Sequence, residues 1–277
     1  MEEPKVILIT GGSSGIGFDA AERLAKEGHR VYAAARRVAK MDPLVASGVT
    51  PLALDITDGS SCKACVEAVL AAEGRIDVLV NAAGYGSFGP LEAVPESEAR
   101  RQMEVNLIGL SRMCSLVIPS MRERGSGRII NIASVAGRAV LYFGGWYNVS
   151  KYGVEAFSDA LRMELKPFGI DVVIIEPGAI RTEWGDITAD NLTSSATGTP
   201  YEDEALREAH NFRTFFQTRF PSDPSVVGEA ISRAVRARKP RIRYRVGFAS
   251  GVVVIGHSLL PARLWDSIGR LIARRFL

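Results

Sequence analysis

The sequence predicts an α/β fold, in which helices cover both faces of one doubly wound parallel sheet within a single domain, residues 1–277. Short, continuously apolar β-branched runs alternate with longer amphipathic stretches, which is the pattern of strands buried on both faces. Apolar residues make up 47% of the chain and charged residues 23%, values that permit a sizeable core and exclude low-complexity disorder. No repeat or linker interrupts the alternation. Right-handed crossovers should then place a ligand crevice at the carboxyl ends of the strands.

Each element can be placed from its own residues. The expected strands are β-branched and apolar, and they cover Val6–Thr10, Val31–Ala35, Pro51–Asp55, Val78–Asn81, Arg128–Ala133 and Val172–Glu176. The expected helices between them have apolar residues at helical spacing, and they cover Gly17–Glu27, Ser60–Glu73, Glu96–Arg122 and Trp146–Phe168. Ser225–Ala237 is also typical of a helix, and Ile242–Val246 of a seventh strand.

The segment from Glu183 to Pro221 breaks this alternation. It is rich in Thr, Ser, Gly and Asn and then carries several phenylalanines. A long insert at the carboxyl edge of a sheet is where a substrate lid would lie, so we expect residues 183–221 to form one. The terminal Pro261–Phe276 has apolar residues at helical spacing, within an apolar and basic C-terminal segment, residues 246–277.

Positive charge is concentrated near the C-terminus. Although the net charge of the chain is +3, residues 233–277 hold 11 Lys or Arg and one acid, Asp266. Such a block indicates contact with an anionic surface or ligand, or else a solvated face near a cofactor phosphate or a subunit contact. The apolar run Val246–Leu260 has 15 residues, fewer than the roughly 20 that a spanning helix needs. We expect no spanning segment, but an apolar tail flanked by arginines would suit peripheral contact with a membrane.

A glycine-rich turn follows the first strand. Its residues, Thr10-Gly11-Gly12-Ser13-Ser14-Gly15-Ile16-Gly17, lead directly into a helical stretch. Glycines let the backbone turn sharply and approach a pyrophosphate, whose charge then lies at the helix N-terminus. The turn lacks the Gly-Lys-Ser/Thr ending of a nucleotide-hydrolysing P-loop. The alternative is a tight strand-to-helix connection that binds nothing.

Further motifs follow the later strands. Asn81-Ala82-Ala83-Gly84 comes after the fourth strand, and Pro177-Gly178 after the sixth. Ser134 ends the fifth strand, 13 residues before Tyr147, and Lys151 lies four residues beyond that tyrosine. A tyrosine and a lysine at this spacing share one helix face.

Together with the glycine turn, these motifs resemble the short-chain dehydrogenase/reductase family over about residues 4–182, in its branch of compact single domains. Two departures are small: Gly12 stands where the family usually has alanine, and Asn148 is a less common residue after the tyrosine. The resemblance implies a Rossmann-like fold and hydride transfer between a nicotinamide cofactor and a carbonyl or alcohol. It also implies a homodimer or homotetramer.

The chemistry expected of the tyrosine and lysine follows from their charges. Tyrosine has a pKa of about 10, and the Lys151 ammonium, helped by a bound oxidised nicotinamide, should favour the phenolate of Tyr147. Tyr147 can then act as general base in alcohol oxidation or general acid in ketone reduction, while the Ser134 hydroxyl holds the carbonyl oxygen. The resemblance adds Asn106 to this catalytic tetrad and implies that it relays protons through a bound water and the lysine. By itself Asn106 is a polar residue in mid-helix that indicates nothing.

The end of the second strand indicates which cofactor binds. A site that selects NAD places an acid about 20 residues after the glycine turn, but Ala35-Arg36-Arg37 stands there. Arg36 can pair with a 2′-phosphate, so the sequence favours NADP(H), the alternative being two surface arginines without a ligand. The resemblance implies that Asp55 holds the adenine amino group, although it can also cap the Thr57–Ser60 turn. The cofactor-binding residues expected in all are Gly11, Ser13, Ser14, Gly15, Ile16, Gly17, Arg36, Arg37, Asp55, Ile56, Asn81, Ala82, Ala83, Tyr147, Lys151, Pro177, Gly178, Ile180 and Thr182.

The cysteines and histidines indicate no further chemistry. Cys62 and Cys65 lack a second pair of metal ligands and lie near the start of a connecting helix, so we expect structural roles and no metal. Three cysteines exclude a disulfide scaffold and suggest a reducing compartment. The isolated His29, His210 and His257 exclude a serine–histidine hydrolase, and no basic-aromatic pattern indicates nucleic acid.

The substrate pocket is expected to be apolar and aromatic. The loops after the fourth to sixth strands and the lid supply its residues, which are Tyr85, Ser134, Leu141, Tyr142, Tyr147 and Trp184. The alternative is that some of these aromatic residues only pack the lid. The expected substrate is a bulky apolar ketone or aldehyde, or its alcohol, which is steroid-, retinoid- or lipid-like.

The sequence therefore predicts an NADP(H)-dependent oxidoreductase acting on CH–OH and C=O groups. Its alternatives are an NAD-dependent secondary-alcohol dehydrogenase and a non-catalytic NADP(H)-sensing protein, although a sensor would usually lack the tyrosine or lysine. The spacing of Gly11, Gly15 and Gly17 argues against extended-branch isomerases and dehydratases, and Lys151 against a halohydrin dehalogenase. The acidic N-terminus is no signal peptide, so we expect a cytoplasmic protein with peripheral membrane contact through its C-terminal segment.

Overall fold

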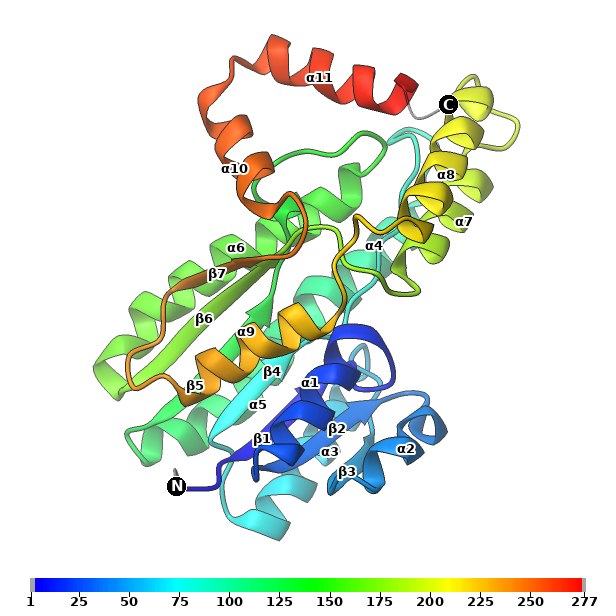
Figure 1. Cartoon of the computed structure of the whole chain (residues 1–277). Coiled ribbons are helices and arrows are strands. Elements are labelled where there is room, and N and C mark those ends of the chain that lie inside the picture. Colours follow the sequence, from blue (N-terminus) through cyan, green and yellow to red (C-terminus); the bar gives the residue numbers. More distant parts are fainter. Residues whose placement is uncertain (1–2, 276–277) are drawn as a thin grey trace.

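Seven parallel strands form one sheet in the computed structural model, which describes residues 3–275 (Figure 1). The strands are β1 (Val6–Thr10), β2 (Arg30–Ala35), β3 (Val49–Ala53), β4 (Val78–Asn81), β5 (Gly127–Ile132), β6 (Ile170–Pro177) and β7 (Arg243–Val246). Their order across the sheet, β3-β2-β1-β4-β5-β6-β7, confirms the doubly wound fold. β3 ends at Ala53, two residues before its predicted end, because the Asp55 N–H donates to Ser61 Oγ at 2.9 Å instead of continuing the ladder.

Helices cover both faces of the sheet and create two cores (Figure 1). The helices are α1 (Gly15–Lys26), α2 (Asp42–Val45), α3 (Gly59–Glu73), α5 (Gly109–Glu123), α6 (Gly145–Leu165) and α9 (Ser225–Arg236). In one core Leu24 of α1 and Ile231 of α9 are fully buried, and in the other Val69 of α3, Val117 of α5 and Val154 of α6 are. Strands buried from both sides have no polar face, which is why they appear in the sequence as continuous apolar runs.

The predicted helix over 96–122 is divided by a π-helical turn. α4 (Glu96–Met103) is joined to α5 through Glu104–Ile108, and Asn106 lies within this turn. A π turn holds one more residue than an α turn, and it turns the Asn106 amide towards the backbone of Tyr85. The residues on either side keep helical spacing, so periodicity alone predicts one unbroken helix.

The segment after β6 folds into two helices that lie side by side above the carboxyl edge of the sheet (Figure 1). These are α7 (Trp184–Ala196) and α8 (Glu202–Gln217). β7 then leads into α10 (Ser250–Leu259) and α11 (Ala262–Arg275), and α11 extends across the top of the molecule towards α8 (Figure 1). The terminal helix thus agrees with the prediction, except that Phe276 lies outside the described residues.

The structure separates the C-terminal positive charge into three places. Residues 233–241 lie around the end of α9 and the start of β7, at the edge of the sheet opposite its carboxyl edge. Arg243 and Arg245 of β7 turn inward to buried carboxylates, whereas Arg263 and Arg270 are exposed on α11. The arginines therefore do not form one continuous basic surface. None of the helices among the described residues is both long and apolar enough to span a membrane.

Candidate active site

The predicted catalytic side chains come together at the carboxyl edge of the sheet. Tyr147 and Lys151 lie on one face of α6, with Lys151 Nζ 5.9 Å from the centroid of the Tyr147 ring. Ser134 follows β5 after a single residue, and its hydroxyl hydrogen-bonds to Tyr147. All three residues are at most 9% exposed. An acid–base group, an ammonium and a hydroxyl thus share one buried site.

Burial determines the protonation of this site. It raises the pKa of Tyr147 to about 12, against the opposing hydrogen bond from Ser134. It also lowers the pKa of Lys151 to about 8, against the opposing charge of Glu155. Burial therefore favours the neutral phenol of Tyr147, the form that donates a proton, whereas the phenolate expected with an oxidised nicotinamide bound stays a prediction. The Lys151 ammonium donates instead to the carbonyl oxygen of Ile132, at 2.9 Å.

Asn106 lies against the same group of residues. Its Oδ1 accepts from the Tyr85 N–H at 3.0 Å, and its Nδ2 donates to the Tyr85 carbonyl at 2.9 Å and to Ser150 Oγ at 3.0 Å. A Cβ on Gly84 would lie 3.2 Å from Asn106 Oδ1 and 3.6 Å from Lys151 Nζ, so both side chains reach one stretch of backbone. The π turn is therefore the local feature that brings Asn106 beside the lysine.

The glycine turn forms a cradle of backbone at the N-terminus of α1. Gly15 has a φ of +57°, and a Cβ on it would lie 3.1 Å from Thr182 across the turn. A Cβ on Gly17 would lie 2.4 Å from the Gly11 carbonyl oxygen, so only glycine fits there. The first turn of α1 carries no acidic residue, so its N–H groups and the positive end of the helix dipole can receive a diphosphate. The residues present therefore fit a dinucleotide.

Thr182 borders this cradle at Gly15, and the backbone of Ala82 and Ala83 borders it at Gly11. Pro177 ends β6, and the Gly178 N–H donates to the Val246 carbonyl at 2.8 Å, which fixes the backbone leading to Ile180. The Ala83 N–H donates to Thr10 at 3.2 Å. The Asn81 side chain turns away from the cradle, because its Nδ2 donates to Asn131 Oδ1 at 2.9 Å. Residues 81–83 therefore face the cradle with their backbone.

Arg36 and Asp55 lie together where β2 and β3 end. Asp55 accepts from the Thr57 N–H at 3.0 Å and from the Thr57 hydroxyl at 2.7 Å. These hydrogen bonds, and to a smaller extent the charge of Arg36, lower the pKa of Asp55. The alternative role of Asp55 as a local cap is thus confirmed, and the cap keeps the carboxylate ionised beside Ile56. Arg36 is exposed and makes no ion pair to any described residue.

Arg37 is engaged differently from Arg36. It contacts Ser14 Oγ at 3.5 Å and pairs at 3.7 Å with Glu183, which immediately precedes α7. Glu183 also pairs with Lys40 at 3.4 Å. The start of the segment predicted to be a lid is thereby connected to the β2 side of the cradle.

Aromatic rings pack against Tyr147. The Trp184 ring lies 5.5 Å from the Tyr147 ring, and Phe88 lies 5.7 Å from each. Leu141 and Tyr142 pack against the same cluster. The cluster gives the site an apolar wall of buried and half-buried side chains.

Tyr85 is the predicted substrate residue that lies apart from this cluster. Its hydroxyl donates to Glu98 Oε1 on α4 at 2.8 Å, and its backbone binds Asn106. Burial, followed by the hydrogen bond to Glu98, raises the pKa of Tyr85. Tyr85 therefore supports Asn106, and its ring is no part of the apolar wall.

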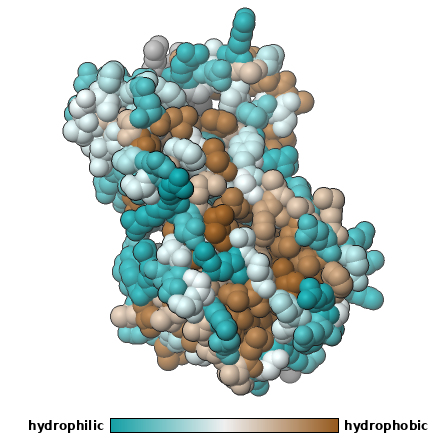
Figure 2. Space-filling view, turned by 180° about the vertical axis from the view of Figure 1, so that it is seen from behind, coloured by the Kyte–Doolittle hydropathy of each residue, from teal (hydrophilic) through white to brown (hydrophobic). Residues whose placement is uncertain are grey.

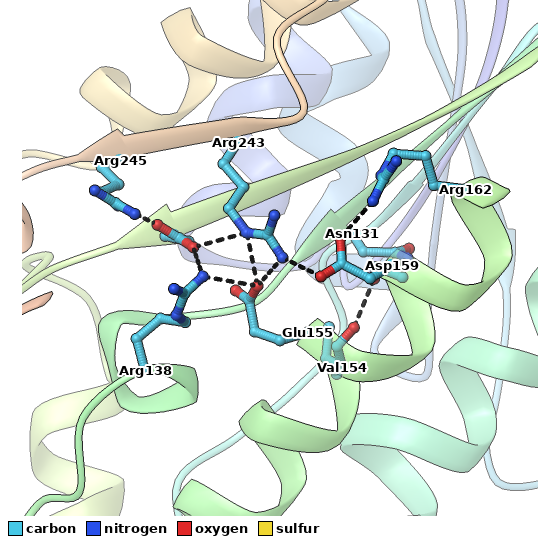
Figure 3. A network of polar contacts seen from close by, with 10 residues as sticks. Asn131, Arg138, Val154, Glu155, Asp159, Arg162, Arg243 and Arg245 are labelled. Carbon is cyan, nitrogen blue, oxygen red and sulfur yellow. Dashed lines mark hydrogen bonds and ion pairs between the residues drawn. The ribbon is translucent and has the colours of Figure 1, made fainter. Parts of the chain in front are cut away.

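A buried network of charges lies behind the catalytic face of α6 (Figure 3). Glu176, at the end of β6, is fully buried and pairs with Arg138, Arg243 and Arg245 at 3.4, 3.2 and 2.6 Å. Arg243 also pairs with Glu155 at 3.1 Å and with Asp159 at 2.5 Å, so one guanidinium joins three carboxylates (Figure 3). The network connects α6 and β6 to β7, the strand that leads into the C-terminal helices.

Glu155 is a member of this network and lies one helical turn after Lys151 on α6. Burial raises the pKa of Glu155 to about 7, the charge of Glu176 acts in the same direction, and Arg243 opposes both. The spacing of four residues from Lys151 was the one sequence signal that could have identified it.

The cysteines are free and buried, in agreement with structural roles for Cys62 and Cys65. Burial raises the pKa of both thiols, that of Cys65 to about 12, which makes them poor nucleophiles. Within residues 3–275 there is no group of three or more metal-ligating side chains of the kind that holds an ion.

The comparisons with known proteins agree with this geometry. The model of the short chain dehydrogenase family matches residues 5–192. The chain belongs to the short-chain dehydrogenase family. A 3-ketodihydrosphingosine reductase of Bacteroides thetaiotaomicron is 36% identical over 247 residues, covering 88% of each protein. Human 17-beta-hydroxysteroid dehydrogenase type 1 is 35% identical, covering 86% of this chain and 76% of that protein. The crystal structure of a short-chain dehydrogenase from Streptomyces avermitilis superposes with a TM-score of 0.80 at 34% identity, covering 97% and 98% of the two chains.

Proposed function

We propose that this short-chain dehydrogenase is an NADP(H)-dependent oxidoreductase that interconverts a bulky apolar ketone or aldehyde and its alcohol. The observation that carries the proposal is the meeting of Tyr147, Lys151 and Ser134 in a buried site with an aromatic wall, beside a glycine cradle that fits a dinucleotide. Two relatives are named for a 3-ketodihydrosphingosine and a 17-beta-hydroxysteroid, which are both bulky and largely apolar molecules. Their names support a steroid-, retinoid- or lipid-like substrate.

Each catalytic side chain has one task in this proposal. The substrate carbonyl oxygen accepts hydrogen bonds from the Ser134 and Tyr147 hydroxyls, and Tyr147 transfers its proton to that oxygen as negative charge develops. A nicotinamide bound beside the glycine cradle would supply the hydride, or accept it in the oxidative direction. Lys151 stabilises the phenolate that remains, and Asn106 fixes the backbone beside Lys151. In the oxidative direction the phenolate takes back the hydroxyl proton.

Arg36 supports a preference for NADP(H) over NAD(H). It stands after β2 where an NAD-selecting site would carry a carboxylate, and it is exposed and not paired to any described acid. A guanidinium in this position can form charge-assisted hydrogen bonds with a 2′-phosphate. Reduction is then the favoured direction in a cytoplasm, where we propose that the protein acts.

We propose that residues 183–221, which contain α7 and α8, are the substrate lid. Trp184 and Phe212 from these helices pack on Phe88, and Trp184 also packs on Tyr147. A bulky substrate reaches Tyr147 only if these rings move apart. The Glu183 pairs with Arg37 and Lys40 would connect that movement to the cofactor side.

The C-terminal helices support peripheral contact with a membrane that stores such substrates. Val252, Ile255 and Leu259 form one stripe on α10 and are 77%, 54% and 77% exposed. Arg263 and Arg270 are exposed on α11, where they can meet anionic headgroups. An apolar stripe with nearby arginines is the pattern of an interfacial helix.

The proposal includes a homo-oligomer. Val149, Tyr152 and Met163 share one exposed face of α6, and Met163 is 64% exposed. Figure 2 shows apolar side chains gathered on the side of the molecule opposite the viewpoint of Figure 1. A second copy of the chain would cover such a face as a two-fold pair.

Binding and turnover together test the proposed function. The fluorescence of Trp184, which lies beside Tyr147, should be quenched by NADPH, and Trp184→Phe should remove most of that change. NADPH should bind at least about tenfold more tightly than NADH, because a charge-assisted hydrogen bond contributes about 1.5–3 kcal/mol. Absorbance should then report NADPH oxidation by 3-ketodihydrosphingosine or a 17-ketosteroid. Equal binding of the two cofactors would contradict the role of Arg36, and absence of binding would contradict the proposed enzyme altogether.

A further inference from the structure

Asn148, the residue directly after Tyr147, is bound to the loop opposite it by three hydrogen bonds. It is 3% exposed, and its Nδ2 donates to the carbonyl oxygens of Ala136 at 2.7 Å and of Ala139 at 2.9 Å. Its Oδ1 accepts from the Leu141 N–H at 3.1 Å. One side chain on the catalytic helix therefore satisfies three backbone groups of a single loop.

This loop, residues 134–144, carries two parts of the active site. It begins with Ser134, whose Oγ accepts from the Ala136 N–H at 3.0 Å, so the position of Ala136 influences that of the catalytic hydroxyl. Farther along, Leu141 and Tyr142 belong to the aromatic wall. A displacement of the loop would therefore move the hydroxyl and the wall together.

The end of the loop is strained, which makes an external support necessary. Phe143 has a φ of +56°, which is an uncommon conformation for a bulky residue and is costly. Its carbonyl oxygen accepts from the Gly89 N–H at 2.8 Å, and its ring packs on Tyr142 with centroids 4.2 Å apart. A strained backbone persists only where its surroundings hold it. Asn148 supplies part of that hold through the Leu141 N–H, two residues earlier.

We propose that Asn148 is a positioning residue that fixes the 134–144 loop relative to Tyr147, and thereby sets both the alignment of Ser134 and the face of the substrate that receives the hydride. An asparagine suits the task because it presents two donors to two carbonyls and one acceptor to an N–H. Asn148→Asp keeps the shape and the acceptor but turns an oxygen towards two carbonyl oxygens. Asn148→Ala removes all three hydrogen bonds.

The first experiment is hydrogen exchange, which requires no substrate. In the purified full-length protein, peptides covering 136–144 should exchange at least about tenfold faster in Asn148→Ala and Asn148→Asp than in the wild type, because a lost hydrogen bond opens the loop. The control is Val69→Ala, which creates a cavity in the core under α3, away from this loop. In that control the loop should exchange at the wild-type rate. Equal exchange of the loop in the wild type and both Asn148 variants overturns the proposal.

The second experiment reads the consequence for catalysis, and this half rests on the proposed function. With NADPH and 3-ketodihydrosphingosine, both Asn148 variants should lose up to about 10²-fold in kcat, since a displacement of about 1 Å has that effect. The ratio of the two alcohol diastereomers should shift at least about threefold, while the NADPH Kd stays within about twofold, as expected of a loop that contacts substrate rather than cofactor.

If Asn148 had a merely structural role, its variants would keep the wild-type diastereomer ratio, as Val69→Ala should. An unchanged ratio in both Asn148 variants would therefore overturn the positioning role, even if the loop exchanged faster. If the wild type does not reduce the ketone at all, the proposed substrate fails, and the exchange experiment alone decides whether Asn148 fixes the loop. Asn148→Asp retains the acceptor for Leu141 and therefore provides a second variant if Asn148→Ala does not fold.

Discussion

Replacing Glu155 by glutamine should make the protein less sensitive to rising pH. Burial raises the pKa of Glu155 from its ordinary value of 4.5 to about 7. Its neutral form is therefore favoured by folding, and the stability that this provides is present below about pH 4.5 and lost as the pH rises through about 7. Each pKa unit corresponds to about 1.36 kcal/mol, so the whole effect is about 3 kcal/mol, of which about 2 kcal/mol falls between about pH 5 and pH 7.5.

The Glu155→Gln variant changes one carboxylate and leaves its charged neighbours in place. The charges of Glu176, Arg138 and Arg243 shift the pKa of Glu155, and the charge of Glu155 shifts the pKa of Lys151. All four of these residues are retained in Glu155→Gln. Urea unfolding at about pH 5 and pH 7.5 should show the variant gaining about 2 kcal/mol relative to the wild type over that interval. The control is Glu67→Gln on the exposed face of α3, where Glu67 is 62% exposed. Parallel pH profiles for Glu155→Gln and the wild type would refute the reasoning.

Three further predictions concern the cofactor and the C-terminal helices. Arg36→Ala should weaken NADPH binding about tenfold and leave NADH within about twofold, measured by tryptophan fluorescence, because only NADPH carries the 2′-phosphate. Glu183→Gln should tighten NADPH binding about twofold to fivefold by releasing Arg37 from an exposed pair, which is an interaction of about 0.2–1 kcal/mol. Val252→Glu with Leu259→Glu should reduce co-sedimentation with anionic vesicles at least about tenfold, because each exposed apolar side chain that enters lipid contributes about 1.5–3 kcal/mol.

A different result would contradict each of these three predictions. An equal loss of NADPH and NADH affinity in Arg36→Ala would mean that the arginine supports the fold of the site rather than the phosphate. Weaker NADPH binding in Glu183→Gln would mean that the contact with Arg37 assists the cofactor. Unchanged sedimentation of the doubly substituted protein would contradict membrane contact through α10. Binding to neutral vesicles as strong as to anionic ones would contradict the contact of Arg263 and Arg270 with anionic headgroups.

The strands and the catalytic residues could be predicted because each depends on residues close in sequence. β-branched runs predicted the seven strands, and the spacing of Ser134, Tyr147 and Lys151 predicted a shared site. Helix α7 was less apparent, because its Thr, Ser and Asn residues are weak helix formers and packing on the aromatic wall stabilises them there.

The buried charges could not be predicted from sequence patterns. Arg243 and Glu155 are 88 residues apart, and nothing local distinguishes Arg243 from the exposed arginines around it. The contacts of Asn148 are similar: its partners become apparent only when the 134–144 loop is folded against α6. The burial of Tyr147, which raises its pKa, also depends on side chains that pack on it from distant parts of the chain.

The most direct test of the central claim is the turnover of Tyr147→Phe. The phenylalanine keeps the ring that packs on Trp184 and Phe88, so the fold and the NADPH Kd should be preserved. It lacks the proton that Tyr147 gives to the carbonyl oxygen, so NADPH oxidation by a ketone that the wild type reduces should slow by about 10²–10⁴-fold. Near-wild-type turnover with intact cofactor binding would contradict the proposed mechanism.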